Sequence, residues 1–182
     1  IKLDPNKIRT KVDQGKLYMH QKKYSLAKKV FEKIIENNSN DPYAYSYLGF
    51  ANYFTQDFEN AKFYFNKSMN LIEIGNENPE NFACPYEGLG MVYYKLNDHN
   101  KSEFFLNKSI NFRPGIVNNK YGLLSDIYVN EKKLNKSLEI LNIWEIYGNN
   151  DSITLFNINI KKSYIYYIMG KNNLTLNLLK KL

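Results

Sequence analysis

The chain has 182 residues, of which 43% are hydrophobic and 15% aromatic, and its formal net charge is +7. This apolar content is enough to bury a hydrophobic core, which excludes a disordered protein. The single cysteine excludes an internal disulfide framework and a four-thiolate metal site. No run of 18 uncharged apolar residues occurs, so we expect no membrane span.

The small number of glycines and prolines, nine and five, favours long helices over most of the chain. Asp41 followed by Pro42 is typical of a helix start, because aspartate caps the first turn and proline fits its first position. The polar stretch from Gly75 to Pro79 predicts a loop. In chain order we predict ten helices, near residues 6–21, 24–37, 42–55, 58–74, 83–96, 99–111, 116–131, 134–147, 152–169 and 172–181.

A pattern of small and bulky residues recurs along these helices. A glycine leads each copy, a small residue follows twelve positions later, and a bulky residue follows sixteen positions later. The copies contain Gly15, Ala27 and Phe31; Gly49, Ala61 and Phe65; and Gly90, Ser102 and Leu106; a weaker fourth copy contains Ser125, Ser137 and Leu141. Two helices that cross closely need a small residue where they meet, with bulky residues around it. The pattern therefore predicts pairs of packed helices.

This pattern resembles the tetratricopeptide repeat, a 34-residue unit of two antiparallel helices, A and B. The second copy carries the family residues Tyr45, Leu48, Gly49, Phe58, Ala61, Phe65 and Ser68, and the third carries Tyr86, Leu89, Gly90, Tyr93, Ser102, Leu106, Ser109 and Pro114. The resemblance implies an all-α fold, a right-handed superhelical solenoid of antiparallel helix pairs. It implies one domain with about four repeats, near residues 8–41, 42–75, 83–115 and 118–149, and a degenerate fifth repeat or cap at 151–182.

The sequence departs from the family pattern in three places. The link between the second and third repeats is seven residues longer than expected, which we interpret as an extended helix B and a polar loop. Trp144 stands where the fourth repeat should have a small residue. Residues 151–182 resemble a fifth helical pair, but their consensus positions do not align uniquely.

Nothing in the sequence points to catalysis, and we predict no enzyme activity, cofactor or bound metal. His99 takes a position that elsewhere holds Tyr24 or Phe58, so we interpret it as a packing residue. Cys84 is interpreted as a small apolar contact, since no neighbour is placed to activate its thiol. His20 is expected at a helix end, and neither histidine has a cysteine or carboxylate cluster at metal-ligand spacing.

The resemblance implies that helix A of each repeat lines a concave groove. In the second repeat, Tyr43, Tyr47, Phe50 and Phe54 follow the spacing i, i+4, i+7 and i+11, which places them on one helical face. That face lies opposite the packing residues of the same helix. Exposed aromatic side chains in a groove favour a partner that covers them. The alternative is that the chain itself covers these four rings.

The third repeat and the charged side chains complete the predicted groove. Gly88 is expected to leave a hollow beside the aromatic stripe, and Met91 is expected to line it adaptably. Lys16, Lys95 and Asp126 form the predicted polar rim.

These residues predict a non-catalytic protein-interaction module, an adaptor, scaffold or assembly factor, that binds a protein or peptide segment in its concave groove. The alternative is the recognition arm of a larger enzyme, because a chain that begins with isoleucine is interpreted as part of a longer one. A nucleic-acid-binding helical repeat is less favoured, since the lysines are spread along the chain rather than gathered on one face. No signal peptide is recognisable, but its absence says little about the compartment, which stays unknown with the cytoplasm slightly favoured.

Overall fold

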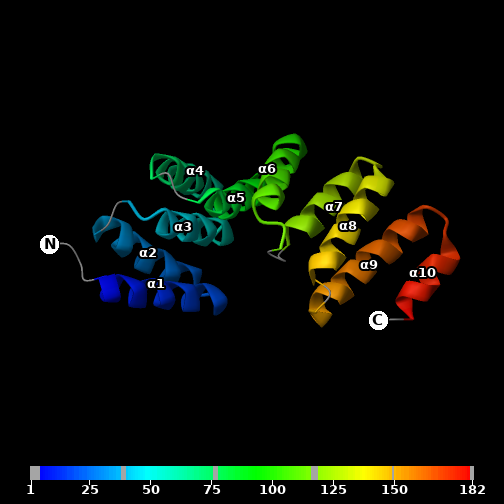
Figure 1. Cartoon of the computed structure of the whole chain (residues 1–182), viewed down its shortest axis with the longest axis horizontal. Helices are drawn as coiled ribbons and strands as arrows, with labels where there is room; N and C mark the ends of the chain where they lie inside the picture. The colour runs from blue at the N-terminus through cyan, green and yellow to red at the C-terminus, as the bar shows by residue number, and fades with distance from the viewer. Residues whose placement is uncertain (1–4, 38–39, 76–77, 116–118, 149, 181–182) are drawn as a thin grey trace.

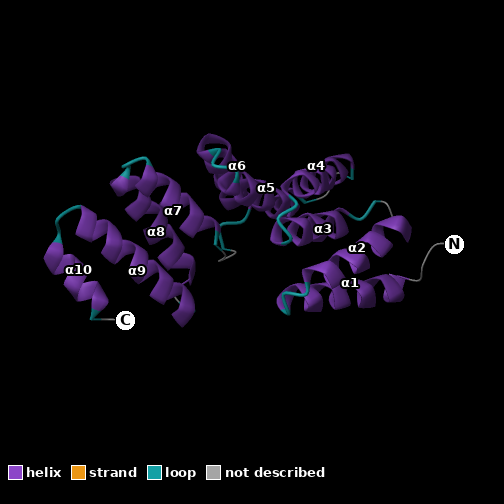
Figure 2. Cartoon of the chain, turned by 180° about the vertical axis from the view of Figure 1, so that it is seen from behind, coloured by secondary structure: helices purple, strands orange, loops and turns teal. Residues whose placement is uncertain are grey.

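The computed structural model describes residues 5–37, 40–75, 78–115, 119–148 and 150–180, and within them all regular structure is helical (Figure 2). The elements are α1 (Pro5–His20), α2 (Tyr24–Asn37), α3 (Pro42–Phe54), α4 (Phe58–Ile74), the short 3-10 helix η1 (Pro79–Phe82), α5 (Ala83–Lys95), α6 (His99–Phe112), α7 (Lys120–Asn130), α8 (Leu134–Gly148), α9 (Ser152–Ile168) and α10 (Asn172–Leu179). The predicted all-α fold class is confirmed.

The observed helices follow the predicted ones closely. The clearest difference is α7, which begins at Lys120 rather than near residue 116, and residues 116–118 lie outside the described part of the chain. The long link was expected to contain only an extended helix and a loop. It also contains η1, which starts at Pro79 because the Asn78 side chain accepts a hydrogen bond from the Glu80 N–H at 3.0 Å.

The helices follow one another in chain order along the long axis of the molecule, with α1 and α10 at opposite ends (Figure 1). Each odd-numbered helix packs against the even-numbered helix that follows it. The odd-numbered helices α1, α3, α5 and α7 also contact one another in sequence, so they form a continuous layer. This layer corresponds to helix A of each repeat, and the even-numbered helices correspond to helix B.

The turn between the two helices of each pair contains one residue with a left-handed backbone. These residues are Lys22, Gln56, Asn97 and Lys132, with φ between 57° and 63°, and Gly170, with φ of 73°. The first four all lie seven positions after the small residue that leads their copy. Counting back seven positions from Gly170 gives Ser163 as the corresponding small residue of the fifth helix pair, α9 and α10. Thr175, twelve positions later, donates a hydrogen bond to the Ser163 carbonyl at 3.4 Å, as this register requires.

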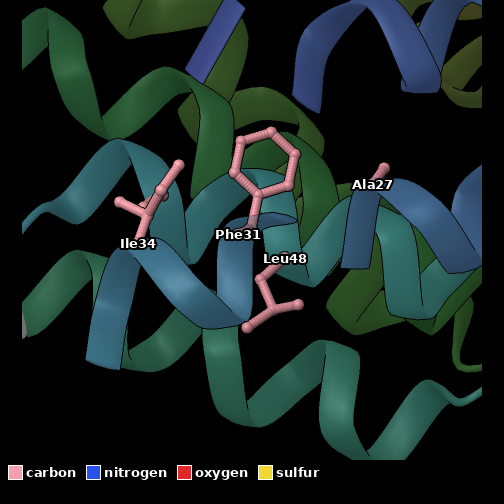
Figure 3. Packing of buried hydrophobic residues seen from close by; sticks show 5 residues of the cluster. Ala27, Phe31, Ile34 and Leu48 are labelled. Atoms are coloured by element: carbon pink, nitrogen blue, oxygen red, sulfur yellow. The ribbon is translucent and has the colours of Figure 1, made fainter. Parts of the chain in front are cut away.

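Bulky helix B residues join each repeat to the small residues of helix A. Phe31 is fully buried, and a methyl group on Gly15 would lie 2.5 Å from its ring. Figure 3 shows Phe31 with Ala27 and Ile34 on α2, and with Leu48 contributed by the following helix. Since only glycine leaves room for this ring, the pattern of small and bulky residues is a consequence of close helix crossing.

Phe65 occupies the corresponding place between the second and third repeats. Its ring touches Gly49 of its own repeat and Gly88 of the next, and a methyl group on Gly49 would lie 2.7 Å from ring carbons. The expected hollow beside Gly88 is therefore wrong, because the Phe65 ring fills that space. The sequence assigned Gly88 to the groove, whereas the residue is buried where α4 meets α5.

Buried serines tie helix B to helix A by hydrogen bonds. Ser102 donates to the Gly90 carbonyl at 2.8 Å and Ser109 donates to the Ala83 carbonyl at 2.9 Å. Ser68 and Ser137 are equally buried, which confirms that all four serines occupy small-residue positions. Such a bond contributes about 1 kcal/mol when both partners are buried.

In the fourth repeat, Trp144 stands at the position that Ser68 and Ser109 hold in the second and third repeats. Its side chain is almost fully buried and stacks on Tyr121 with ring centroids 6.3 Å apart. The residue that faces it on helix A is Gly122, whereas the second repeat has Ser46 facing Ser68 at 2.8 Å. The indole is accommodated because the opposing side chain is absent.

A Gly88→Ala substitution tests the junction at Phe65. The added methyl group would overlap a ring that is already held by Gly49, so we expect a loss of about 1–3 kcal/mol in unfolding free energy. Gly115→Ala is the control, since its nearest neighbour, Tyr147, would lie 3.9 Å away. Chemical denaturation measures both variants. Equal stability of Gly88→Ala and the wild type would contradict the packing described for Phe65.

Candidate aromatic binding surface

The four aromatic residues of the predicted groove all lie on α3, but they differ in exposure. Tyr43 and Phe54, at the two ends of the helix, are 44% and 42% exposed. Tyr47 and Phe50, between them, are half-buried against residues of the core. The stripe therefore has two exposed ends and a centre that rests on the chain's own packing.

Tyr47 is held by the first repeat. The Tyr47 ring stacks on that of Phe31 in α2, with ring centroids 5.1 Å apart. The ammonium group of Lys16 in α1 lies 5.5 Å from the centre of the Tyr47 ring. A lysine at that distance is attracted to the face of an aromatic ring. Burial, with smaller contributions from Cys84 and Asp13, raises the pKa of Tyr47 above its usual value. The fold thus brings together two residues that the sequence assigned to the same site.

Phe50 and Phe54 pack in different ways. The rings of Phe50 and Phe65 pack edge to face with their centroids 4.9 Å apart, so Phe50 supports the junction between the second and third repeats. The Phe54 ring stacks on that of Tyr24 with centroids 4.6 Å apart and packs edge to face with Tyr53 with centroids 5.2 Å apart. The rest of the Phe54 side chain is exposed to solvent. Truncating Phe50 would therefore disturb packing, whereas Phe54 can contact a partner without leaving its neighbours.

A pocket of about 380 Å³ adjoins the Phe54 end of the stripe. It is lined by Tyr53, Phe54, Gln56, Phe58 and Lys95. Lys95 is exposed, so the pocket combines an aromatic wall with a cation, as the predicted rim requires. The sequence analysis assigned Phe58 to packing as a family residue and did not single out Tyr53, so it missed both as lining residues.

Asp126 lies apart from the aromatic stripe. It forms an ion pair with Lys161 across α7 and α9, in a second pocket of about 200 Å³. That pocket also includes Tyr94 and Tyr164, which the sequence did not single out. Met91 is half-buried on α5. The predicted site residues therefore fall into two places on the helix A layer rather than one.

The residues considered for catalysis are dispersed in the fold. His20 is exposed at the end of α1, and His99 is half-buried with its ring 6.0 Å from that of Tyr94. Burial, reinforced by Glu87, raises the pKa of Cys84. Within the described ranges, no three His, Cys, Asp or Glu residues are grouped so that they could hold a metal ion. The same ranges include no helix with the length and apolarity to cross a membrane.

This architecture defines a helical-repeat solenoid, in which successive helix pairs pack side by side. The family model described as "Tetratricopeptide repeat" matches residues 8–41 and 85–115. These two segments of the chain are therefore recognised as tetratricopeptide repeats, and the described helices have the fold of a tetratricopeptide repeat protein. Proteins of this family are commonly protein-interaction modules and are generally not catalysts. A search of curated protein sequences finds no match.

Solved structures of tetratricopeptide repeat proteins share this fold. YrrB, described as a TPR protein with an unusual peptide-binding site, has a TM-score of 0.61 and 18% identity, covering 94% of this chain and 82% of its own. A MamA fragment from Desulfovibrio magneticus has a TM-score of 0.73 and 15% identity, covering 100% and 94%. The APC/C complex Cut9–Hcn1 gives 0.73 and 17%, covering 85% of this chain and 29% of that one. At these identities the likeness concerns the fold alone.

The thiol of Cys84 provides a test of the interpretation that this residue packs rather than reacts. Since the thiolate is the reactive form and burial raises the pKa, less thiolate is present at neutral pH than in the unfolded chain. We expect iodoacetamide to modify folded Cys84 at least about tenfold more slowly than the denatured protein, with the rate rising as pH increases. Phe63→Cys in a Cys84→Ser background supplies an exposed control thiol. Equal rates for the two thiols would contradict this interpretation.

Proposed function

We propose that the chain is a non-catalytic adaptor, scaffold or assembly factor that holds a segment of a partner protein along the helix A layer at α3. The observation that carries the proposal is the exposure of Tyr43 and Phe54, at 44% and 42%, in the interior of a row of packed helices. Aromatic side chains supply large contact areas with few rotatable bonds, and they are enriched where binding energy concentrates.

The charges beside the stripe indicate what the bound segment carries. Lys16 lies beside Tyr47 and Lys95 lies beside Phe54. Among the described residues, neither amine has a carboxylate within ion-pair distance. A segment with apolar side chains over the rings and acidic residues near these two lysines complements this surface. The two lysines affect specificity and association rate more than affinity, because exposed ion pairs are screened by salt.

A double substitution at the exposed ends of α3 tests the proposal. We expect Tyr43→Ala with Phe54→Ala to reduce the recovery of a partner at least about tenfold, since aromatic hot spots contribute about 2 kcal/mol or more each. The melting temperature should fall by only a few degrees, because the main loss of packing is the Phe54–Tyr24 stack, worth about 1 kcal/mol. Affinity capture followed by mass spectrometry identifies the partner, and titration with the purified partner measures the change.

Phe63→Ala is the matched control, because this exposed phenylalanine lies on α4, outside the helix A layer. It should leave partner recovery unchanged. Partner binding that survives the double substitution, or that is lost equally with Phe63→Ala, would refute the assignment of the site to α3. Phe50→Ala is a poor test, because its contact with Phe65 makes stability and binding change together.

A further inference from the structure

Two helix pairs meet at an aromatic stack in the first junction of the array. Tyr24 is the first residue of α2, and Phe54 is the last residue of α3. Their rings stack with centroids 4.6 Å apart and planes 12° apart. Tyr24 is half-buried. The first residue of one helix B thus receives a ring from the end of the next helix A, and the chain itself fills this junction.

The second junction has only half of this arrangement. Phe58 is the first residue of α4, and Lys95 is the last residue of α5. They hold the positions of Tyr24 and Phe54 one repeat later. Within the described part of the chain, the Phe58 ring contacts that of Tyr53 in its own repeat, with centroids 5.9 Å apart and planes at 52°. An exposed lysine therefore stands where the first junction has a stacking ring.

The pocket of about 380 Å³ lies at this second junction. Tyr53, Phe54 and Phe58 form its aromatic walls, and Gln56 and Lys95 complete its lining. An apolar cavity of about 150 Å³ is enough to hold a benzene ring. The pocket therefore has room for an aromatic side chain. Both repeats that form it are flanked by further described repeats, so the pocket does not arise from an end of the array.

The two later junctions have residues of a different kind at these positions. In the third junction, His99 begins α6 and Asn130 ends α7. In the fourth, Leu134 begins α8 and Ile168 ends α9. The third pair is polar and the fourth is aliphatic. Of the four junctions between described helix pairs, the second is therefore the one in which an aromatic residue lacks an apolar counterpart.

The charges at the pocket indicate a second feature of its occupant. Among the described residues, the Lys95 amine has no carboxylate within ion-pair distance. Asp57 precedes Phe58 in the sequence but does not line the pocket. Its carboxylate instead caps α4, because it accepts hydrogen bonds from the Asn60 N–H at 3.2 Å and from the Asn60 side-chain amide at 2.7 Å. An anion beside the ring would therefore meet a cation that no carboxylate of the lining neutralises.

We propose that the pocket takes one aromatic side chain of the partner segment, stacked on Phe58, with an acidic residue of that segment beside Lys95. The occupant takes the place that Phe54 holds against Tyr24 in the first junction. The inference rests on the proposed function, and it specifies which kind of partner residue enters the α3 surface. Because stacked rings have a preferred geometry, this position discriminates between an aromatic and an aliphatic side chain.

The compound 3-phenylpropionate tests the pocket without a partner, because it joins a phenyl ring to a carboxylate. Titration of the whole isotope-labelled chain should shift the amide signals of residues 53–58 and of Lys95 in NMR spectra. We expect 3-cyclohexylpropionate, which lacks the flat ring, and 3-phenylpropylamine, which reverses the charge, to bind at least about threefold more weakly. Absence of shifts at these residues, or equal binding of the three compounds, would overturn the proposal.

A ring supplied from α5 provides a second test, because it fills the pocket from within the chain. Lys95→Phe should place its ring against Phe58 and weaken the binding of 3-phenylpropionate at least about tenfold. Lys67→Phe is the matched control, since it makes the same exchange at an exposed position of α4 outside the pocket lining. It should leave the affinity unchanged. Wild-type affinity in the folded Lys95→Phe variant would contradict the proposed occupant.

Reversal of the charge at residue 95 gives a test that does not depend on filling the pocket. Lys95 is exposed, so Lys95→Glu should keep the fold, as measured by circular dichroism. We expect this variant to bind 3-phenylpropylamine at least about threefold more tightly than 3-phenylpropionate, with a difference that shrinks as salt is raised. The wild-type order of affinities in Lys95→Glu would overturn the proposal.

Partner capture separates this inference from the proposed function. Lys95→Phe should reduce partner recovery at least about tenfold, as Tyr43→Ala with Phe54→Ala should. If recovery is lost in the double variant but complete in Lys95→Phe, the aromatic occupant is wrong and the α3 surface stands. Complete recovery in both variants would overturn the two proposals together.

Discussion

The structure depends on the contact between one bulky helix B side chain and the small residues of two A helices. Phe65 makes this contact most fully, with Gly49 on its own repeat and Gly88 on the next. A ring held on both sides fixes the distance between α3 and α5 and couples the two repeats. Phe31 makes the corresponding contacts with Gly15 on its own repeat and, by ring stacking, with Tyr47 on the next. Since each repeat contacts mainly its neighbours, stability is distributed along the row through such contacts.

The same contact determines which surfaces remain for partners. Because Phe31 and Phe65 take up the inner sides of Tyr47 and Phe50, only the ends of the α3 stripe stay well exposed. The proposed surface at α3 therefore consists of aromatic side chains that the repeat architecture positions but does not fully cover.

Much of the fold could be predicted from residue spacing, because close helix crossing restricts side-chain size at fixed positions. Gly49 with Phe65 and Gly90 with Leu106 specify the pairs, and the four buried serines follow the same rule. The site was less predictable. Placing Tyr43 and Phe54 on one side of a helix needs only its period, but the burial of Tyr47 and the position of Asp126 depend on neighbouring repeats. The consensus positions of the fifth helix pair could not be aligned uniquely from the sequence, and the left-handed turn at Gly170 gives its register.

The sequence by itself determined the helix pairs, their approximate limits and the aromatic character of α3, because these follow from local spacing along one chain. Only the tertiary structure decided which residues contact each side of a helix. Gly88 was expected to leave a hollow, yet Phe65 from α4 fills it, and Trp144 fits only because Gly122 faces it. Such outcomes depend on residues that are distant in the sequence and adjacent in space. Periodicity specifies which side of a helix a residue occupies, whereas only packing specifies whether another side chain is already there.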